Sequence, residues 1–281
     1  MTYCVAFLLE KGLVFASDSR TNAGVDYISS YSKLHVFQPA EDRLFVIMAA
    51  GNLGTTQAVL NRIRRDIDRH HEAATERADR KPAADGPACP SDGSRGAAAP
   101  GATSSAPPTL LTARYLFEAA DYIGKLSVDV QRQFSTSLRE AGATGEASFI
   151  LGGQIAGEKH GLYLIYPQGN AVMATAETPF LQIGESKYGK PPLDYIGHSR
   201  LSLEDAARLC LVSQIITRRA NLTVGPPFEI ALVPANELRV SRRVKLEKDC
   251  DEVNRSMEVW TRTMQEGLQR LPRFAWEQDP L

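Results

Sequence analysis

Residues 2–9, with the sequence TYCVAFLL, form an apolar run that begins directly after Met1. A turn signal at residues 10–12, EKG, and a second apolar run at residues 13–17, LVFAS, follow it. Two short apolar runs joined by a turn are typical of a β-hairpin, and the lack of polar alternation indicates buried strands. We therefore expect the chain to start with a hairpin of two largely buried strands.

The position of Thr2 at the start of this strand has a chemical consequence. If Met1 is removed, Thr2 would carry both a hydroxyl and a free α-amino group. A hydroxyl is a weak nucleophile unless a base takes its proton, and an α-amine titrates at about pH 7.7–8.0, which suits such a base. Because threonine commonly follows an initiator methionine, Thr2 alone does not indicate a catalytic site.

The composition is that of a globular protein without a charge bias. The chain has 281 residues, 43% of them hydrophobic, and a formal net charge of -1. This fits one large domain, or a domain with an insertion, and gives no attraction to nucleic acid or to an anionic membrane. No apolar run is long enough to span a bilayer, and the N-terminus lacks the features of a signal peptide. We therefore expect a cytoplasmic protein.

The metal-binding residue types are few and scattered. The four cysteines, Cys4, Cys89, Cys210 and Cys250, include no C-x-x-C pair, so neither a zinc site nor a disulfide framework is expected. The pair His70-His71 has no ligand-spaced partner and fits a solvated helix end better than a metal site. The sequence predicts no metal and no cofactor.

Strands and helices are expected in separate groups along the chain. A polar loop at residues 19–30 precedes predicted strands at residues 33–37, 44–50, 148–153, 162–166, 171–174, 180–183 and 228–233. Apolar residues at helical spacing predict helices at residues 55–69, capped by Thr55 or Thr56, and at 110–139, 202–219 and 253–271. This grouping predicts an α+β fold of antiparallel sheets with helices packed outside, in a single domain over residues 2–281.

Residues 73–108 differ in composition from the rest of the chain. They are rich in Pro, Ala, Gly and Ser, and they contain no aromatic residue. Such a segment cannot bury enough apolar surface to offset its ordering entropy. We expect a disordered insertion between two helices, with a role as a binding segment as the alternative.

Three residues at predicted strand ends could join Thr2 in one site. Asp18 follows the second strand, Lys33 opens the third and Gly51 ends the fourth. In acyl transfer, the Thr2 hydroxyl would attack an amide carbonyl while its α-amine takes the proton. Lys33 would supply positive charge beside the hydroxyl, and Asp18 would hold Lys33 in place. The Gly51 N–H would stabilise the developing oxyanion.

Each of these residues also has an ordinary explanation. Asp18 could belong to a turn with an exposed ion pair, Lys33 could be a solvated residue at a strand edge, and Gly51 could be a turn glycine. The combination, with its spacing, is what favours a catalytic site.

The combined pattern resembles the proteasome-type threonine peptidases, a family of N-terminal nucleophile hydrolases. The matching motifs are Thr2, GLVFASDSR at residues 12–20, Lys33-Leu34 and AGNLG at residues 50–54. Within this family, the sequence motifs most resemble those of the bacterial branch called Anbu, the ancestral beta subunit. That likeness lies in residues 17–26 (SDSRTNAGVD), 149–154 (FILGGQ) and 184–191 (GESKYGKP).

The resemblance implies a four-layer αββα sandwich of two antiparallel sheets, with Thr2, Asp18 and Lys33 as the catalytic set. It also implies a homo-oligomer, a ring or an open spiral, that encloses its sites and acts on peptide or protein substrates. Met-Thr is a sequence from which methionine aminopeptidase can remove Met1. The sequence identifies neither the cleavage preference nor an ATPase partner.

The chain departs from the family pattern near the expected amine. Where the family has a G-S-G-S turn, residues 184–187 of this chain read GESK. Ser186 is therefore an approximate substitute for the family's serine, and we include it in the candidate site. The aspartate of the R-D-x-x-S-G segment is missing, and Asn221 and Thr223 are the nearest polar residues. Two alternatives to a peptidase therefore stay open: an assembled scaffold or peptide-binding chamber with weak or no proteolysis, and a small-molecule amidase.

Overall fold

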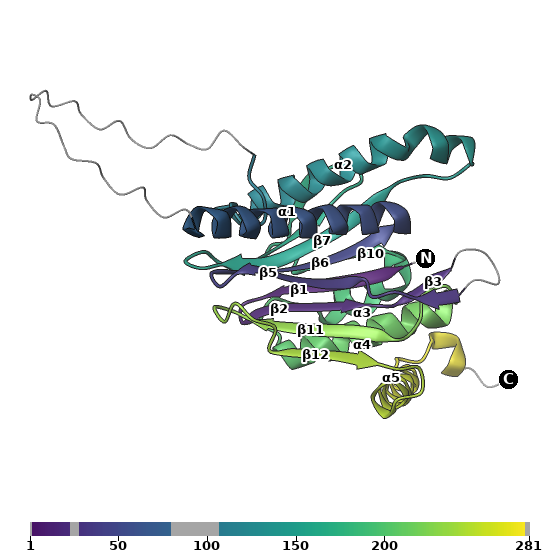
Figure 1. Cartoon of the computed structure of the whole chain (residues 1–281). Helices are drawn as coiled ribbons and strands as arrows, with labels where there is room; N and C mark the ends of the chain where they lie inside the picture. The colour runs from purple at the N-terminus through teal and green to yellow at the C-terminus, as the bar shows by residue number, and fades with distance from the viewer. Residues whose placement is uncertain (1, 23–27, 80–106, 279–281) are drawn as a thin grey trace, which may run out of the picture.

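The computed structural model describes residues 2–22, 28–79 and 107–278 of the chain. Its strands are β1 Tyr3–Leu9, β2 Gly12–Ser17, β3 Arg20–Asn22, β4 Ile28–Ser30, β5 Leu34–Ala40, β6 Arg43–Gly51, β7 Ala147–Ile155, β8 Gly161–Ile165, β9 Ala171–Met173, β10 Phe180–Gly184, β11 Phe228–Pro234 and β12 Arg242–Leu246. Its helices are α1 Leu53–Asp79, α2 Leu116–Glu140, α3 Ser186–Ile196, α4 Leu203–Ala220, α5 Asp251–Gln269 and a 3-10 turn at Ala275–Gln278. Two stacked sheets lie between two pairs of helices (Figure 1).

The first sheet is built around the N-terminal hairpin. Its strand order is β10-β1-β2-β11-β12, and every pair is antiparallel. Side chains of a strand alternate between the two faces: Tyr3, Val5 and Phe7 pack with residues of α3 and α4, whereas Cys4 and Ala6 pack against the second sheet. Both faces of β1 are therefore buried, as the unbroken apolar run predicts.

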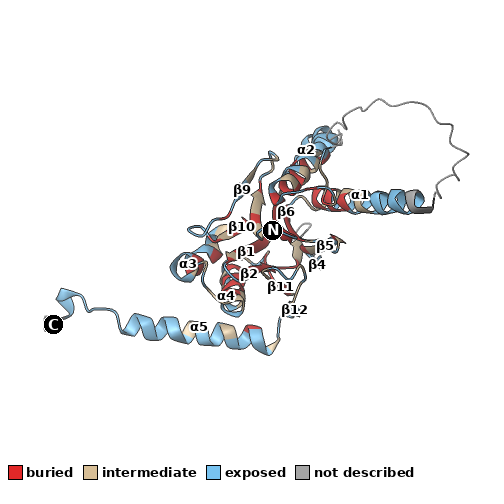
Figure 2. Cartoon of the chain, turned by 90° about the vertical axis from the view of Figure 1, so that its left-hand side faces the viewer, coloured by how far each residue is buried: buried red, intermediate tan, exposed pale blue. Residues whose placement is uncertain are grey.

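The second sheet has the order β5-β6-β7-β8-β9 and is also antiparallel throughout. Phe45 and Ile47 of β6 pack under α1 and α2, whereas Val46 and Met48 face the first sheet. The molecule thus has three apolar layers: one between the sheets and one under each helix pair (Figure 2). The predicted α+β fold, an αββα sandwich, is confirmed.

Several predicted boundaries were wrong. Helix α1 continues to Asp79 rather than ending near residue 69, so residues 73–79 of the predicted insertion are helical; residues 80–106 lie outside the described ranges. Its cap is Asn52, whose side-chain Oδ1 accepts the Thr55 N–H (3.1 Å), and Thr55 and Thr56 lie inside the first turn. Helix α2 starts at Leu116, and the predicted loop at 19–30 contains the short strands β3 and β4.

Helix α3 and strand β12 were also not predicted, nor was the 3-10 turn at Ala275–Gln278. Helix α3 contains Pro191 and Pro192, which lack the backbone N–H that a helix uses and therefore hide its pattern. Strand β12 is an edge strand with an exposed Arg242-Arg243 pair and little apolar alternation. Only the pairing of β12 with the buried strand β11 makes it a strand.

The C-terminal helix α5 differs from the others in its exposure. Val253 packs into the core beneath α4, but Met257, Met264 and Leu268 are exposed. Figure 2 shows α5 running away from the body of the molecule with most of its length exposed. Within the described residues, none of the helices combines the length and apolar character needed to cross a membrane.

Candidate active site

Thr2 is held by backbone contacts at the start of β1, an internal strand of the first sheet. Its carbonyl oxygen accepts the Glu185 N–H (2.8 Å), and the next residue, Tyr3, lies opposite Gly184 in the β1–β10 pair. Gly184 has a φ of 82°, and a Cβ atom added there would lie 1.9 Å from the Thr2 carbonyl oxygen. Glycine is therefore required at this position for the backbone of Thr2 to come so close to β10.

Asp18 and Lys33 form a buried ion pair next to Thr2 in the fold. The Lys33 Nζ lies 2.6 Å from Asp18 Oδ1, and the two residues are 7% and 0% exposed. Lys33 also donates a hydrogen bond to the Arg20 carbonyl oxygen (2.6 Å). The ammonium is thus fixed from two sides, by Asp18 directly after β2 and by Arg20 at the start of β3.

Backbone amides also hold the Asp18 carboxylate. Oδ1 accepts the Tyr3 N–H (3.0 Å) and Oδ2 accepts the Gly225 N–H (3.2 Å). Burial raises the pKa of Asp18, while the Lys33 charge and these hydrogen bonds oppose that rise. Since Tyr3 directly follows Thr2, one carboxylate fixes both the Lys33 ammonium and the strand that carries Thr2.

Gly51 ends β6 and lines one cavity together with Thr2 and Lys33. Its φ is 116°, and an added Cβ would lie 2.3 Å from the Glu146 carbonyl oxygen, so a side chain does not fit. The Ala49 N–H donates to the Lys33 carbonyl oxygen on the β5 side. Because amide directions alternate along a strand, the Gly51 N–H is directed to that side as well, beyond the start of β5.

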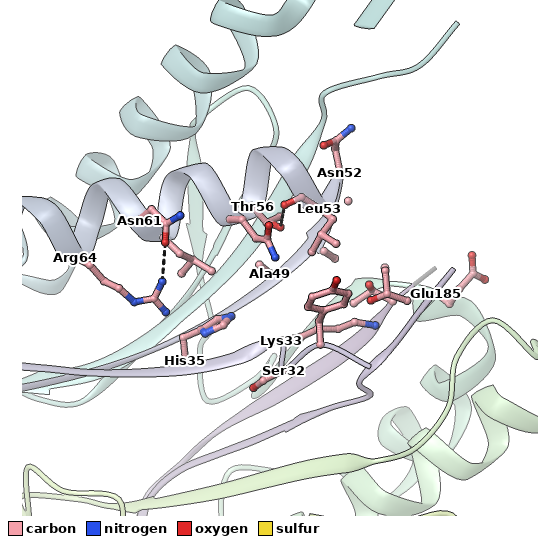
Figure 3. Close-up of a pocket in the computed structure, with 18 residues that line it drawn as sticks. Ser32, Lys33, His35, Ala49, Asn52, Leu53, Thr56, Asn61, Arg64 and Glu185 are labelled. Carbon is pink, nitrogen blue, oxygen red and sulfur yellow. Dashed lines mark hydrogen bonds between the residues drawn. The ribbon is translucent and has the colours of Figure 1, made fainter. Parts of the chain in front are cut away.

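A cavity of about 970 Å³ joins these residues. Thr2, Lys33 and Gly51 line it, and its other walls come from β5, from the end of β6 and from one side of α1. Figure 3 shows Lys33 and Glu185 at one end of the cavity, with Arg64 and His35 at the other. The predicted Thr2, Lys33 and Gly51 therefore share one open space, and Asp18 lies behind Lys33.

Ser186, Asn221 and Thr223, the nearest substitutes for the serine and aspartate of the family pattern, are not among the described residues that line the cavity. Ser186 is the first residue of α3, and its carbonyl oxygen accepts a hydrogen bond from Gln182. Asn221 caps the end of α4, and its Oδ1 accepts the N–H and the hydroxyl of Thr223 (3.0 and 2.6 Å). Instead, Gly184 and Glu185 are the residues of this turn that line the cavity.

Sequence reasoning missed the residues at the far end of the cavity. His35, Asn61 and Arg64 line it there. Burial, with a smaller contribution from the Arg64 charge, lowers the pKa of His35 to about 4, so the imidazole is neutral at physiological pH. The helical spacing of Thr56, Leu60 and Arg64 was the one available signal, but it does not say which side of a helix faces a cavity.

Comparison with solved structures identifies close relatives. The Anbu (Gly-1) mutant from Hyphomicrobium sp. strain MC1 is 34% identical with a TM-score of 0.78, over 98% of this chain and 99% of that one. Anbu (ancestral beta-subunit) from Yersinia bercovieri is 33% identical with a TM-score of 0.76, over 97% and 99%. The helical assembly of the Anbu complex from Pseudomonas aeruginosa is 36% identical with a TM-score of 0.76, over 99% and 100%. No family model matches the chain, and no curated protein matches it.

Proposed function

The chain belongs to the Anbu family, the ancestral-beta-subunit branch of the proteasome-like N-terminal nucleophile hydrolases, and we propose that it is a threonine hydrolase that cleaves peptide bonds. The observation that carries this proposal is the buried Asp18–Lys33 pair, 2.6 Å apart, beside Thr2 in an open cavity. A buried ion pair is costly to desolvate. Its position at a cavity that Thr2, the residue after Met1, also lines therefore favours a catalytic role.

The proposed reaction begins once Met1 has been removed. The Thr2 Oγ attacks the carbonyl carbon of an amide, and the freed α-amine of Thr2 takes the hydroxyl proton. Negative charge develops on the carbonyl oxygen, and this oxygen accepts a hydrogen bond from the Gly51 N–H. The C–N bond then breaks, the leaving amine receives the proton from the α-ammonium, and an ester to Thr2 remains. A water molecule attacks this ester by the same route and releases the acid.

Lys33 and Asp18 have distinct parts in this proposal. The Lys33 ammonium is an opposite charge that favours the alkoxide-like form of the Thr2 hydroxyl. Asp18 is a positioning residue, because its carboxylate holds Lys33 and the Tyr3 N–H rather than the substrate. The assignment of Ser186 as a catalytic residue stays a prediction; its place at the start of α3 gives it no part in these steps.

We also propose that the chain self-assembles into a ring or an open spiral. A relative from Pseudomonas aeruginosa forms a helical assembly. In this chain, the exposed apolar residues of α5 provide a surface that a second copy could cover. Such an assembly would place the cavities of several subunits around a shared inner space.

A chamber with weak or no proteolysis is the second candidate. Two observations favour it: the Asn221 oxygen is taken up by Thr223, and Ser186 lies outside the cavity lining of the described residues. A binding chamber would keep the cavity and the assembly but turn over slowly.

The deciding experiment combines mass and covalent labelling. Intact mass of the purified assembly should give the value for a chain without Met1. A β-lactone or epoxyketone probe should label the wild type and the Thr2→Ser variant, but not Thr2→Ala. Thr178→Ala, which removes an exposed threonine hydroxyl elsewhere, should label like the wild type. Full retention of Met1, or labelling of Thr2→Ala, would exclude this mechanism.

A further inference from the structure

One side of helix α1 forms a wall of the cavity and ends in a cation. Leu53, Thr56, Leu60 and Arg64 line the cavity at intervals of three or four residues, so they lie on one face of the helix. Side chains of a helix lean towards its N-terminus, which here is the end nearest Gly51. Arg64 therefore leans back along the cavity towards the proposed reaction centre, as Figure 3 shows.

The Arg64 guanidinium is only partly engaged. Its Cζ lies over the Phe37 ring, 5.8 Å from the ring centroid, and one N–H donates to Asn61 Oδ1 (3.0 Å). A guanidinium has five N–H donors. Within the described parts of the chain, no carboxylate lies in ion-pair distance of Arg64, whereas the adjacent Arg65 pairs with Asp66 at 2.9 Å. The charge of Arg64 and most of its donors are thus available inside the cavity.

The surroundings of Arg64 leave its charge uncompensated at this end. His35 lies beneath it on β5 and is neutral at physiological pH, and the charge of Lys33 is balanced by Asp18. Among the described lining residues, the sole carboxylate is that of Glu185, at the opposite end of the cavity. The cavity therefore has a positive end at Arg64 and a negative one at Glu185.

The spacing of Lys33 and His35 relates the reaction centre to this positive end. Lys33 directly precedes β5 and His35 is the second residue of that strand, so their Cα atoms are about 7 Å apart. A glutamate side chain spans most of that distance, whereas a group several residues further along an extended peptide lies beyond it. A carboxylate bound at Arg64 would thus belong to the residue at the scissile bond or to its immediate neighbour.

On the basis of the proposed function, we propose that Arg64, with Asn61 and His35, forms a subsite for a carboxylate close to the scissile amide. Guanidinium and carboxylate pair in a planar, two-point geometry, and the cation–π contact with the Phe37 ring favours the guanidinium at this end of the cavity. The carboxylate can come from an aspartate or glutamate side chain, or from the C-terminus of a short peptide. Substrates with lysine or arginine at this position are disfavoured by charge repulsion.

Binding to the assembled Thr2→Ala protein tests this subsite without requiring turnover. The probes are fluorescent peptides with blocked ends that differ only in Glu or Gln at one position, which is moved along the peptide. One position should show about 10-fold tighter binding of the Glu peptide, as expected for one charge-assisted pair. The preference should disappear in Thr2→Ala/Arg64→Gln and persist in Thr2→Ala/Arg65→Gln, the matched control on the same helix.

A second peptide pair separates the two sources of the carboxylate. A peptide with only apolar side chains is compared with a free and with an amidated C-terminus. Tighter binding of the free acid, lost with Arg64→Gln, assigns the subsite to a terminal carboxylate, whereas an effect confined to the Glu peptides assigns it to a side chain. Equal binding of every pair at 50 mM salt, or a preference that survives Arg64→Gln, overturns the proposal, because screening is weak at this ionic strength.

Failure of this subsite and failure of the proposed hydrolase give different results. If Thr2→Ala is still labelled by the covalent probe, the hydrolase mechanism fails, but the carboxylate preference of the cavity can still be measured. If Thr2 is labelled and the Glu and Gln peptides bind equally, the hydrolase stands and the Arg64 subsite is wrong.

Discussion

At the scale of single residues, Asp18 is the centre of the candidate site. It accepts hydrogen bonds from the Lys33 ammonium and from the N–H groups of Tyr3 and Gly225, and it is fully buried. Three different segments of the chain therefore meet on one carboxylate. Removing its charge should affect both the stability of the fold and the chemistry at Thr2, and these two effects can be separated.

Asp18→Asn should lower both stability and activity. The change leaves the Lys33 ammonium buried beside a neutral amide, which typically costs about 3–5 kcal/mol of unfolding free energy. Covalent labelling at Thr2 should slow roughly 100-fold, the scale of losing a proton-transfer or charge contribution. The double variant Asp18→Asn/Lys33→Met removes both charges, so it should recover stability in urea unfolding but not labelling. Wild-type labelling rates in the double variant would contradict the role given to the pair.

His35 should make the protein less stable in acid. Its pKa is about 4 in the folded state against 6.5 in the unfolded chain. Between these values the unfolded chain binds a proton that the folded protein does not. The stabilising contribution is therefore complete above pH 6.5 and is lost as the pH falls to 4, by about 3 kcal/mol at most.

The variant His35→Gln isolates this contribution. Urea unfolding measured from pH 7 to pH 4 should show a shallower loss of stability in His35→Gln than in the wild type. His198→Gln removes a histidine for which no such burial applies and should keep the wild-type slope. Parallel curves for the wild type and His35→Gln would show that His35 titrates normally in the folded protein.

At the scale of elements, the N-terminal hairpin was predictable, whereas its pairing with β10 was not. The apolar runs of β1 and β2 and the turn between them are local signals, and the structure pairs them directly, with Leu9 opposite Gly12. The pairing of β1 with β10 joins residues far apart in the sequence, from Tyr3 with Gly184 to Phe7 with Phe180. The sequence offers only Gly184 as a trace of it, since the close approach of Thr2 that requires this glycine exists only in the folded chain.

The same distinction explains which site residues the sequence revealed. Asp18, Lys33 and Gly51 stand at strand ends within a recognisable motif, so their convergence could be expected. Arg64 was missed because its role depends on α1 lying across β5, which no local pattern specifies. Tertiary packing, rather than propensity, decides which face of a helix lines a cavity.

Gly184→Ala should disturb the N-terminal strand more than its backbone angle alone explains. The new Cβ would lie 1.9 Å from the Thr2 carbonyl oxygen, so β10 and the first residues of β1 must separate. Gly157→Ala is the matched control, because Gly157 has a similar φ of 84° with no atom within 4 Å. The control should lose about 1–2 kcal/mol of unfolding free energy, whereas Gly184→Ala should lose more and should also fail to react with the probe. Equal losses and equal labelling would mean that the contact with Thr2 is unimportant.

At the scale of the whole molecule, α5 is the element that the fold of one chain does not explain. It joins the core through Val253, and beyond that point it exposes apolar residues that continue past its end, to Phe274 and Trp276. Exposed apolar surface of this extent is typical of interfaces between proteins. A second copy of the chain is the partner that the proposed assembly supplies, so α5 should stabilise the oligomer rather than the protomer.

Charged substitutions on α5 should therefore reduce assembly while leaving the protomer folded. Met264 and Leu268 are 59% and 70% exposed and lie one helical turn apart. Burial of such a side chain contributes about 1.5–3 kcal/mol, so Met264→Lys/Leu268→Lys should weaken association about 100-fold or more. Light scattering coupled to gel filtration should show smaller species at micromolar protein, with an unchanged circular dichroism spectrum. Met173→Lys, which charges a comparably exposed methionine on β9, should assemble like the wild type. If the α5 variant forms an oligomer of wild-type size, the subunit interface lies on another surface. The assembly would then have to enclose the open cavity beside Thr2 without this helix.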